Sequence, residues 1–323
     1  MVTISVALCT FNGARFVEQQ LRSILDQSLM PREVIVADDG STDATLELVR
    51  AVHEQYGDGV ELRVLPSERN LGVTANFERA VRACTGEFVA LSDQDDVWHR
   101  DRLATAAAAL DADPALLLHH GNARLVDAEG HPLGVSLLDA LSVSAGEREQ
   151  IASGHAFDAL VRRNLVTGAT VMFRRELLEH ALPFPSEWVH DEWLAIVAAA
   201  VGGVRLDDAE IIDYRQHGGN QIGAQKPTLR YRIGRMLEPR GDRYTRLAAR
   251  AGALAGRIDA LPTSNHNRQL AHDRARFDEL RATLPASRPA RLRTVVHEWR
   301  AGSYAALSSQ GNLDVVRDLL QPA

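Results

Sequence analysis

The sequence of 323 residues predicts an α/β fold, in which a mixed but mostly parallel sheet is flanked by helices and followed by a helical C-terminal region. Short β-branched runs alternate with helical spacing through the first 130 residues, and from about residue 226 only helical spacing remains. Alternation of this kind is typical of a parallel sheet wrapped by helices. A composition of 45% apolar and 24% charged residues is ordinary for a folded protein with a sizeable core.

The first part of the chain alternates between expected strands and expected helices. The expected strands are residues 2–8, 33–37, 60–65, 87–91 and part of 116–126. The expected helices are residues 14–27, 42–56, 73–84 and 102–110. Val17, Leu21 and Ile24 show the apolar spacing of a helix that buries one face. Ser41 or Thr42 is expected to cap the second helix.

The second part is less regular. Residues 127–150 are rich in turn formers and predict an excursion or flexible loop. After it we expect a strand, a helix and two short strands, at residues 170–173, 191–201, 204–206 and 211–214. We therefore predict one domain over residues 1–225, divided near residue 127, and a basic helical region over residues 226–323.

Charge is divided unevenly between these two regions. Residues 1–225 contain 18 Lys and Arg against 34 Asp and Glu, whereas residues 226–323 contain 18 against 9. No run approaches the roughly 18 apolar residues of a membrane-spanning helix. Cys9 and Cys84 lie in apolar runs without zinc-site spacing, and the N-terminus resembles a strand more than a signal peptide. We expect a cytoplasmic protein, with peripheral contact at the inner face of the membrane left open.

Aspartates gather directly after the strand expected at residues 87–91. Asp93 and Asp95 are two residues apart, so on an extended segment their side chains share a face. Two carboxylates this close need a cation or a proton between them, and oxygen ligands suit Mg²⁺ or Mn²⁺. A solvated acidic turn is the alternative.

Two other expected strands also end in polar, turn-forming residues. Asp38 and Asp39 follow the second strand, while Thr10 and Asn12 follow the first. In open α/β sheets, ligands bind beyond the carboxyl ends of the strands, so these ends predict one ligand crevice.

Four motifs resemble a known family when they are taken in order. TFNG at 10–13, ADDGSTD at 37–43, SERNLGVTANFERA at 67–80 and LSDQDDVW at 91–98 are similar to the nucleotide-sugar-binding half of a family-2 glycosyltransferase with the Rossmann-like GT-A fold. The resemblance covers roughly residues 2–223. The DQDDxW form resembles rhamnosyltransferase-like enzymes of cell-surface polysaccharide synthesis.

The resemblance implies a role for each motif. Residues 1–127 would bind the nucleotide-sugar and residues 128–225 would form the acceptor and catalytic half. The residues implied in nucleotide-sugar binding here are Thr10, Asn12, Asp39, Arg69 and Asp93. Asp95 would be the more direct ligand of a divalent cation, Mn²⁺ or Mg²⁺. Trp98 is expected to pack locally.

The resemblance also assigns residues in the second half. Gly168 would let the backbone approach the sugar or acceptor, although a plain turn glycine is the alternative. Asp191 would be the general base, with Glu192 as the fallback and His190 as a neighbour. Asp191 could instead be only a favourable charge at a helix start.

The segment YRQHGGNQIG at residues 214–223 is similar to the closing segment of the family. His217 would be a metal ligand, and Arg215 and Asn220 would face the diphosphate. An exposed loop histidine is the alternative. Gly218, Gly219 and Gly223 suggest a mobile lid.

Together these residues predict an inverting, metal-dependent transfer of a sugar, with rhamnose as a candidate, from a UDP- or dTDP-linked donor to a hydroxyl of a saccharide or lipid-linked saccharide. One alternative is a haloacid-dehalogenase-type phosphatase with Asp93 as nucleophile, but its usual lysine has only Lys226 as a candidate. Another is an inactive protein that binds nucleotide-sugar. Arginines such as Arg230, Arg243 and Arg250 suit anionic lipid, a solvated face or an oligomer contact, and no motif indicates nucleic acid.

Overall fold

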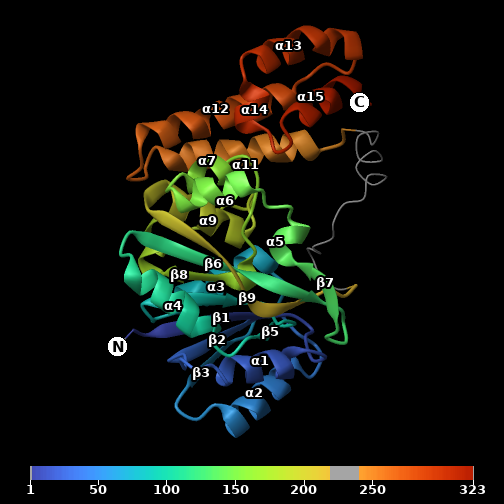
Figure 1. Ribbon diagram of the computed structural model, residues 1–323. Coiled ribbons are helices and arrows are strands. Elements are labelled where there is room, and N and C mark those ends of the chain that lie inside the picture. Colours follow the sequence, from blue (N-terminus) through green and yellow to red (C-terminus); the bar gives the residue numbers. More distant parts are fainter. Residues whose placement is uncertain (1, 219–239, 323) are drawn as a thin grey trace. The chain divides into compact units, whose positions relative to one another are not determined.

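The computed structural model describes residues 2–218 and 240–322 (Figure 1). The chain divides into two compact units, unit 1 with residues 1–154 and 165–225, and unit 2 with residues 155–164 and 226–323. Residues 155–164, expected in the acceptor half, thus group with the C-terminal helices. Several residues of the sequence predictions lie outside the described residues: Gly219, Asn220, Gly223, Lys226 and Arg230.

Unit 1 is built on a nine-stranded mixed sheet with the order β3-β2-β1-β4-β8-β6-β9-β5, in which β7 pairs with β6. The strands are β1 (Ile4–Thr10), β2 (Glu33–Asp38), β3 (Glu61–Leu65), β4 (Phe88–Ser92), β5 (Val97–Trp98), β6 (Leu116–Val126), β7 (Pro132–Ser136), β8 (Val171–Arg174) and β9 (Gly203–Arg215). The mixed α/β fold is confirmed.

The first four strands in space are parallel, as predicted. β1 pairs with β2 and β4, and β2 pairs with β3, all in parallel register. Every residue of β1, β2 and β4 is buried, which suits central strands covered on both faces.

The other half of the sheet is less parallel than we predicted. β8 is antiparallel to both β4 and β6, and β5 is antiparallel to β9, while β9 runs parallel to β6. The prediction of two short strands at 204–206 and 211–214 was wrong, because β9 is continuous. Its pairing with β6 shifts register between His120 and Asn122, which accommodates the acidic segment DDAE at residues 207–210.

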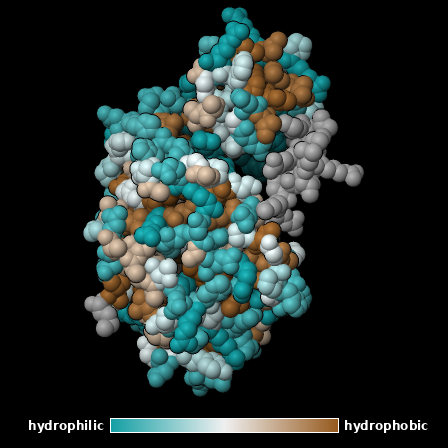
Figure 2. Space-filling model, viewed as in Figure 1, coloured by the Kyte–Doolittle hydropathy of each residue, from teal (hydrophilic) through white to brown (hydrophobic). Residues whose placement is uncertain are grey.

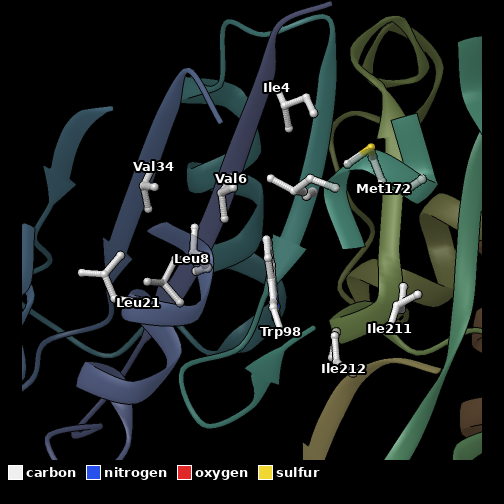
Figure 3. Close-up of a cluster of buried hydrophobic side chains, with 14 of the residues drawn as sticks. Ile4, Val6, Leu8, Leu21, Val34, Trp98, Met172, Ile211 and Ile212 are labelled. Atoms are coloured by element: carbon white, nitrogen blue, oxygen red, sulfur yellow. The ribbon is translucent and has the colours of Figure 1, made fainter. Parts of the chain in front are cut away.

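Helices cover both faces of this sheet (Figure 1). One face packs against α1 (Val17–Leu25), α2 (Thr45–Tyr56) and α4 (Arg102–Ala112). Figure 3 shows Ile4, Val6 and Leu8 of β1 in this core with Leu21 of α1. The other face is covered by α3 (Val73–Ala83) and α9 (His190–Val201), which contact each other.

Two local predictions were wrong. Residues 127–150 are not irregular, since they form β7, α5 (Leu137–Ala140) and α6 (Ala145–Ala152), the last with a capping box at Ser144. Neither Ser41 nor Thr42 caps α2. Asp43 accepts the Thr45 N–H at 3.0 Å instead, while the Ser41 hydroxyl donates to Asp38.

Unit 2 is helical throughout its described residues. Its helices are α7 (Ala156–Leu160), α11 (Arg243–Ile258), α12 (Asn265–Ala282), α13 (Arg288–Arg300), α14 (Ser303–Leu307) and α15 (Asn312–Leu320). A small apolar core surrounds Phe277, Val295 and Tyr304. In the described part of the chain, no helix has the length and hydropathy required to cross a membrane.

Candidate active site

The strand directions bring five chain segments to one edge of the sheet. β1, β2 and β4 are parallel, so the residues after Thr10, Asp38 and Ser92 share that edge. β8 reverses direction and β6 reverses it again, so the parallel strand β9 also ends there, at Arg215. The start of β8, after Gly168, lies at the same edge because β8 is antiparallel to β4. The topology therefore gathers the motifs that sequence predicted in a crevice.

Thr10 and Asp39 form the floor of the expected nucleoside side. The Thr10 hydroxyl donates to Asp38 Oδ2 at 2.8 Å. The Asp39 carboxylate accepts the N–H groups of Leu71 and Gly72 at 2.7 and 2.9 Å, which attaches the 67–72 loop to the end of β2. Both Thr10 and Asp39 are buried, at 2% and 3% exposure.

Asn12 and Arg69 lie nearer the solvent. Asn12 has a positive φ of 48°, and its side-chain oxygen accepts the Thr42 N–H at 2.9 Å. Asparagine tolerates this left-handed conformation better than most residues, so its position after β1 has a backbone reason as well. Arg69 is exposed, and its guanidinium makes no hydrogen bond within the described ranges 2–218 and 240–322. It is therefore available to an anionic ligand.

The acidic turn, residues 93–96, connects β4 to β5 and concentrates negative charge. Burial raises the pKa of Asp93 to about 7, with further contributions from Asp95 and Asp191. Burial also raises the pKa of Asp96, again with the charges of Asp95 and Asp93. Carboxylates that lie close together in a poorly solvated site raise one another's pKa in this way. The turn therefore has an excess of negative charge that a cation would offset.

Asp95 pairs with His217, the histidine that the family resemblance implies as a metal ligand. His217 Nε2 lies 2.8 Å from Asp95 Oδ2, and its ring packs on Phe16 with centroids 4.8 Å apart. No group of three or more His, Cys, Asp or Glu in the described residues is arranged to hold a metal. Mg²⁺ and Mn²⁺ commonly use one or two protein ligands and complete their shell with water and substrate phosphate. One carboxylate, one imidazole and surplus negative charge fit such an ion.

Arg215 ties the end of β9 to the acidic turn. Its guanidinium donates to the Asp95 carbonyl at 2.8 Å, the Ala128 carbonyl at 2.9 Å and Gln19 Oε1 at 2.8 Å. Its backbone N–H donates to Asp96 Oδ1 at 3.1 Å. The side chain is 3% exposed, so its donors point into the protein. Contact between Arg215 and the diphosphate stays a prediction. This geometry favours a role in which Arg215 positions the acidic turn.

Asp191 and Gly168 meet at the start of α9. Asp191 Oδ2 accepts the Gly168 N–H at 2.7 Å, and Oδ1 accepts the Glu192 N–H at 2.7 Å. A Cβ at Gly168 would lie 3.1 Å from His190 Nε2 and 3.3 Å from Asp191 Cβ. A larger residue at position 168 would therefore have to displace His190 or Asp191 by a few tenths of an ångström, and the two hydrogen bonds fix the orientation of the Asp191 carboxylate.

His190 is a buried neighbour of Asp191. Its ring stacks on Phe77 of α3 with centroids 3.8 Å apart and an interplanar angle of 15°. Burial lowers the pKa of His190 to about 3, so the ring is neutral near pH 7. Glu192 is only partly buried.

Sequence reasoning missed three residues around the acidic turn. Gln94 exchanges two hydrogen bonds with the backbone of Phe11, at 2.8 and 3.1 Å, and so joins the turn to the end of β1. The ring of Phe11 is 44% exposed at this edge. Arg102 is buried with its guanidinium 3.5 Å from the ring centre of Trp98, and burial lowers its pKa to about 9. The exposed Phe11 follows an apolar strand, which was a usable signal, but no spacing rule identifies Gln94 or Arg102.

Residues 5–132 match the family model for glycosyl transferase family 2. An uncharacterized glycosyltransferase of Nostoc is 27% identical over 67% of this chain and 66% of its own length. A dTDP-rhamnosyl transferase of Shigella flexneri is 24% identical over 67% of this chain and 74% of its own length. The chain thus spans just under two thirds of the Nostoc relative.

Solved structures share the fold over nearly the whole chain. The S. aureus TarS fragment 1–349, in complex with UDP-GlcNAc, superposes with a TM-score of 0.59 and 18% identity, covering 98% of this chain and 90% of that one. The mannosyltransferase PcManGT from Pyrobaculum calidifontis, in complex with GDP-Man and Mn²⁺, gives a TM-score of 0.55 and 22% identity, covering 99% and 84%. At these identities the likeness concerns the fold.

Proposed function

Because residues 5–132 match the family model for glycosyl transferase family 2, we propose that the chain transfers a sugar from a nucleoside-diphosphate donor to an acceptor hydroxyl. The observation that supports this most is the pairing of Asp95 with His217 at the same sheet edge as Asp191. That edge combines a cation site with a fixed carboxylate. The phosphatase alternative depends on Lys226, the one lysine of the sequence, which lies outside the described residues.

For the donor, we propose a UDP- or dTDP-linked sugar that binds along the ends of β1, β2 and β4. TarS is in complex with UDP-GlcNAc, and the Shigella relative is named for dTDP-rhamnose transfer. Rhamnose is therefore one candidate sugar. Asn12 and Arg69 are exposed toward a ligand, while the ring of Phe11 offers an apolar surface for a base. Asp39 and Thr10 shape the floor beneath them and keep the 67–72 loop in place.

For the cofactor, we propose Mn²⁺ or Mg²⁺ held by Asp95 and His217, with Asp93 close to both ion and donor. PcManGT is in complex with Mn²⁺. When bound, the ion supplies positive charge beside the diphosphate, where negative charge grows as the sugar leaves. Arg215 keeps Asp95 in position through the carbonyl of the same residue.

For the chemical step, we propose that Asp191 takes the proton of the acceptor hydroxyl. The acceptor oxygen forms a bond to the anomeric carbon while the bond from that carbon to the diphosphate oxygen breaks. The electron pair leaves with the nucleoside diphosphate, and the sugar passes through an oxocarbenium-like state. Attack from the face opposite the diphosphate inverts the configuration. Gly168 and Glu192 donate to Asp191 and so fix the direction of its carboxylate.

The acceptor is proposed to be a saccharide or a lipid-linked saccharide of the cell surface. The named activity of the Shigella relative supports a saccharide product. We place the reaction in the cytoplasm, since Cys9 and Cys84 are buried free thiols that suit a reducing compartment.

A thermal-shift panel tests the donor and the ion together. UDP, dTDP and their sugars should stabilise the chain in the presence of Mn²⁺, and EDTA should remove the effect. Asp95→Asn and His217→Ala should each lose the Mn²⁺-dependent part. A well-folded chain that no nucleotide stabilises, with or without Mn²⁺, would contradict the proposal.

Asp191→Asn tests the base. An amide cannot accept at both positions, so one N–H of Gly168 or Glu192 loses its acceptor at a cost of about 1–3 kcal/mol in unfolding free energy. Transfer should be abolished while donor binding survives. Glu192→Gln is the matched control, and its transfer rate should stay within the native range. Transfer by the Asp191→Asn protein near the native rate would remove Asp191 from this role.

A further inference from the structure

The helices α13 and α15 of unit 2 turn apolar side chains toward solvent. Leu292 and Trp299 of α13 are 53% and 49% exposed. On α15, the exposed residues are Leu313, Val316 and Leu320, at 50%, 43% and 53%. These five are spaced by three, four or seven residues along their helices, so each helix presents one apolar stripe.

Helix α15 buries its charged residues. Asp314, Arg317 and Asp318 of α15 are 1%, 6% and 0% exposed. Asp318 accepts hydrogen bonds from Arg281 Nε at 2.7 Å, Tyr244 at 2.7 Å and Tyr304 at 2.8 Å. Charges buried without partners would be costly, and here they are paired. α15 is therefore stably packed with its polar face inward and its apolar face outward.

The stripes of α13 and α15 lie side by side. Arg291 Nη1 donates to the Gln321 carbonyl at 2.8 Å, and Trp299 Nε1 donates to Asn312 Oδ1 at 3.1 Å. These contacts align the two helices antiparallel, so the end of α13 that contains Leu292 lies near the end of α15 that contains Leu320, and the end with Trp299 lies near the end with Leu313. Figure 2 shows apolar side chains gathered over this part of unit 2. We call the five exposed residues the α13–α15 face.

The charge around the α13–α15 face has one sign. Arg288, Arg293 and Arg300 of α13 are exposed, and within the described residues none has an acidic group within ion-pair distance. The carboxylates of the two helices belong to Glu298, Asp314 and Asp318, and all of them are buried. Among their described residues, α13 and α15 thus combine exposed leucine and tryptophan with unpaired arginine and present no exposed carboxylate.

We propose that the α13–α15 face docks on a lipid bilayer that contains anionic headgroups. Apolar side chains enter the boundary between headgroups and acyl chains, tryptophan prefers that boundary, and arginines attract the anionic surface. An ordinary soluble surface would instead mix both charge signs between its apolar residues. The proposal concerns unit 2 and stands whichever sugar unit 1 transfers.

Co-sedimentation of the full chain with vesicles tests the proposal. The chain should pellet with phosphatidylcholine vesicles that contain phosphatidylglycerol, and much less with phosphatidylcholine alone. Leu313→Ser with Leu320→Ser should lower the partition coefficient by about tenfold or more, since half-exposed leucines lose their burial in lipid. Met30→Ser with Leu133→Ser, two similarly exposed apolar residues of unit 1, is the matched control and should leave it unchanged.

Fluorescence provides a second test on the unsubstituted chain. Of the four tryptophans, Trp299 is the one exposed residue, and brominated lipid should quench it. Trp299→Phe should remove most of that quenching. Absence of both pelleting and quenching overturns the proposal. So does a dimer in sedimentation that the Leu313 and Leu320 substitutions dissolve, because the face would then bind a second copy. Nucleotide-dependent thermal shifts, measured on the same variants, report separately on the proposed transfer site.

Discussion

Replacing Arg215 with methionine should damage both stability and metal binding. The change keeps the length of the aliphatic stem and removes three hydrogen bonds, to the Asp95 carbonyl, the Ala128 carbonyl and Gln19. The side chain is 3% exposed, so water cannot replace those donors without a rearrangement. Loss of buried hydrogen bonds from a charged donor should lower the free energy of unfolding by about 3–5 kcal/mol.

The effect on the metal follows from the position of Asp95. Its carbonyl accepts a hydrogen bond from Arg215 Nε, and its carboxylate lies 2.8 Å from His217 Nε2. Loss of the Arg215 hydrogen bond should therefore let Asp95 move relative to His217, the other proposed ligand. Residues that orient metal ligands typically change affinity by about 10–100-fold when they are lost. We expect a decrease of that size in Mn²⁺ affinity, measured by electron paramagnetic resonance of free Mn²⁺ in the presence of UDP.

Arg174→Met is the matched control for this prediction. Arg174 also donates to buried carbonyls, those of Leu116 at 3.0 Å and Leu110 at 2.6 Å, but it pairs with Phe88 at the opposite edge of the sheet. The Arg174→Met protein should lose stability and keep its Mn²⁺ affinity. If Arg215→Met binds Mn²⁺ like the native chain, or if Arg174→Met loses as much affinity, then Arg215 does not act by positioning Asp95.

Three further predictions concern other residues. Burial lowers the pKa of His120 and His190 to about 3, so as pH falls from about 6.5 toward about 3 the unfolded chain binds more protons and stability is lost, by about 1.4 kcal/mol per pH unit for each. In His120→Leu, the free energy of unfolding should therefore fall less steeply as pH is lowered. An unchanged slope would contradict a lowered pKa for His120. Asp318→Asn removes one of the two buried carboxylates beside Arg281, the other being Asp314 at 3.6 Å, and should cost about 1–3 kcal/mol in chemical denaturation, with native stability as the contrary result. Gly168→Ala places a methyl group 3.1 Å from His190 Nε2, so turnover should fall about tenfold while calorimetry finds donor affinity unchanged, and full turnover would show that the site yields easily.

The first half of the fold was predictable because its signals are local. Strands β1, β2 and β4 are short apolar runs, and the helices between them have a clear apolar stripe, so both periods are visible in the sequence. The second half depends on pairing between distant segments. Nothing within residues 203–215 shows that polar positions around 207–210 continue one strand, since β6 provides the partner and absorbs the register shift.

The candidate site divides in the same way. The position of Asp93 and Asp95 after a buried strand is a local signal, and the structure places that strand end at the sheet edge that it shares with the ends of β1, β2 and β9. The hydrogen-bond partners of a side chain are not local. Arg215 matched an expected diphosphate ligand, yet its donors bind Asp95, Ala128 and Gln19, which lie between 87 and 196 residues away in the sequence. Spacing identifies which residues reach a site, but not which of them face the ligand.

The late strand β9 means that His217, one of the two residues proposed to hold the cation, lies far from the segment that matches the family. Residues 5–132 include Asp95, whereas His217 and the Arg215 guanidinium come from the end of β9. A polypeptide shortened after residue 132 would retain every matching motif and yet lack both. During synthesis, too, the pair can assemble only after more than 200 residues have emerged, so the nascent chain passes through a long stage in which its aspartates have no histidine beside them.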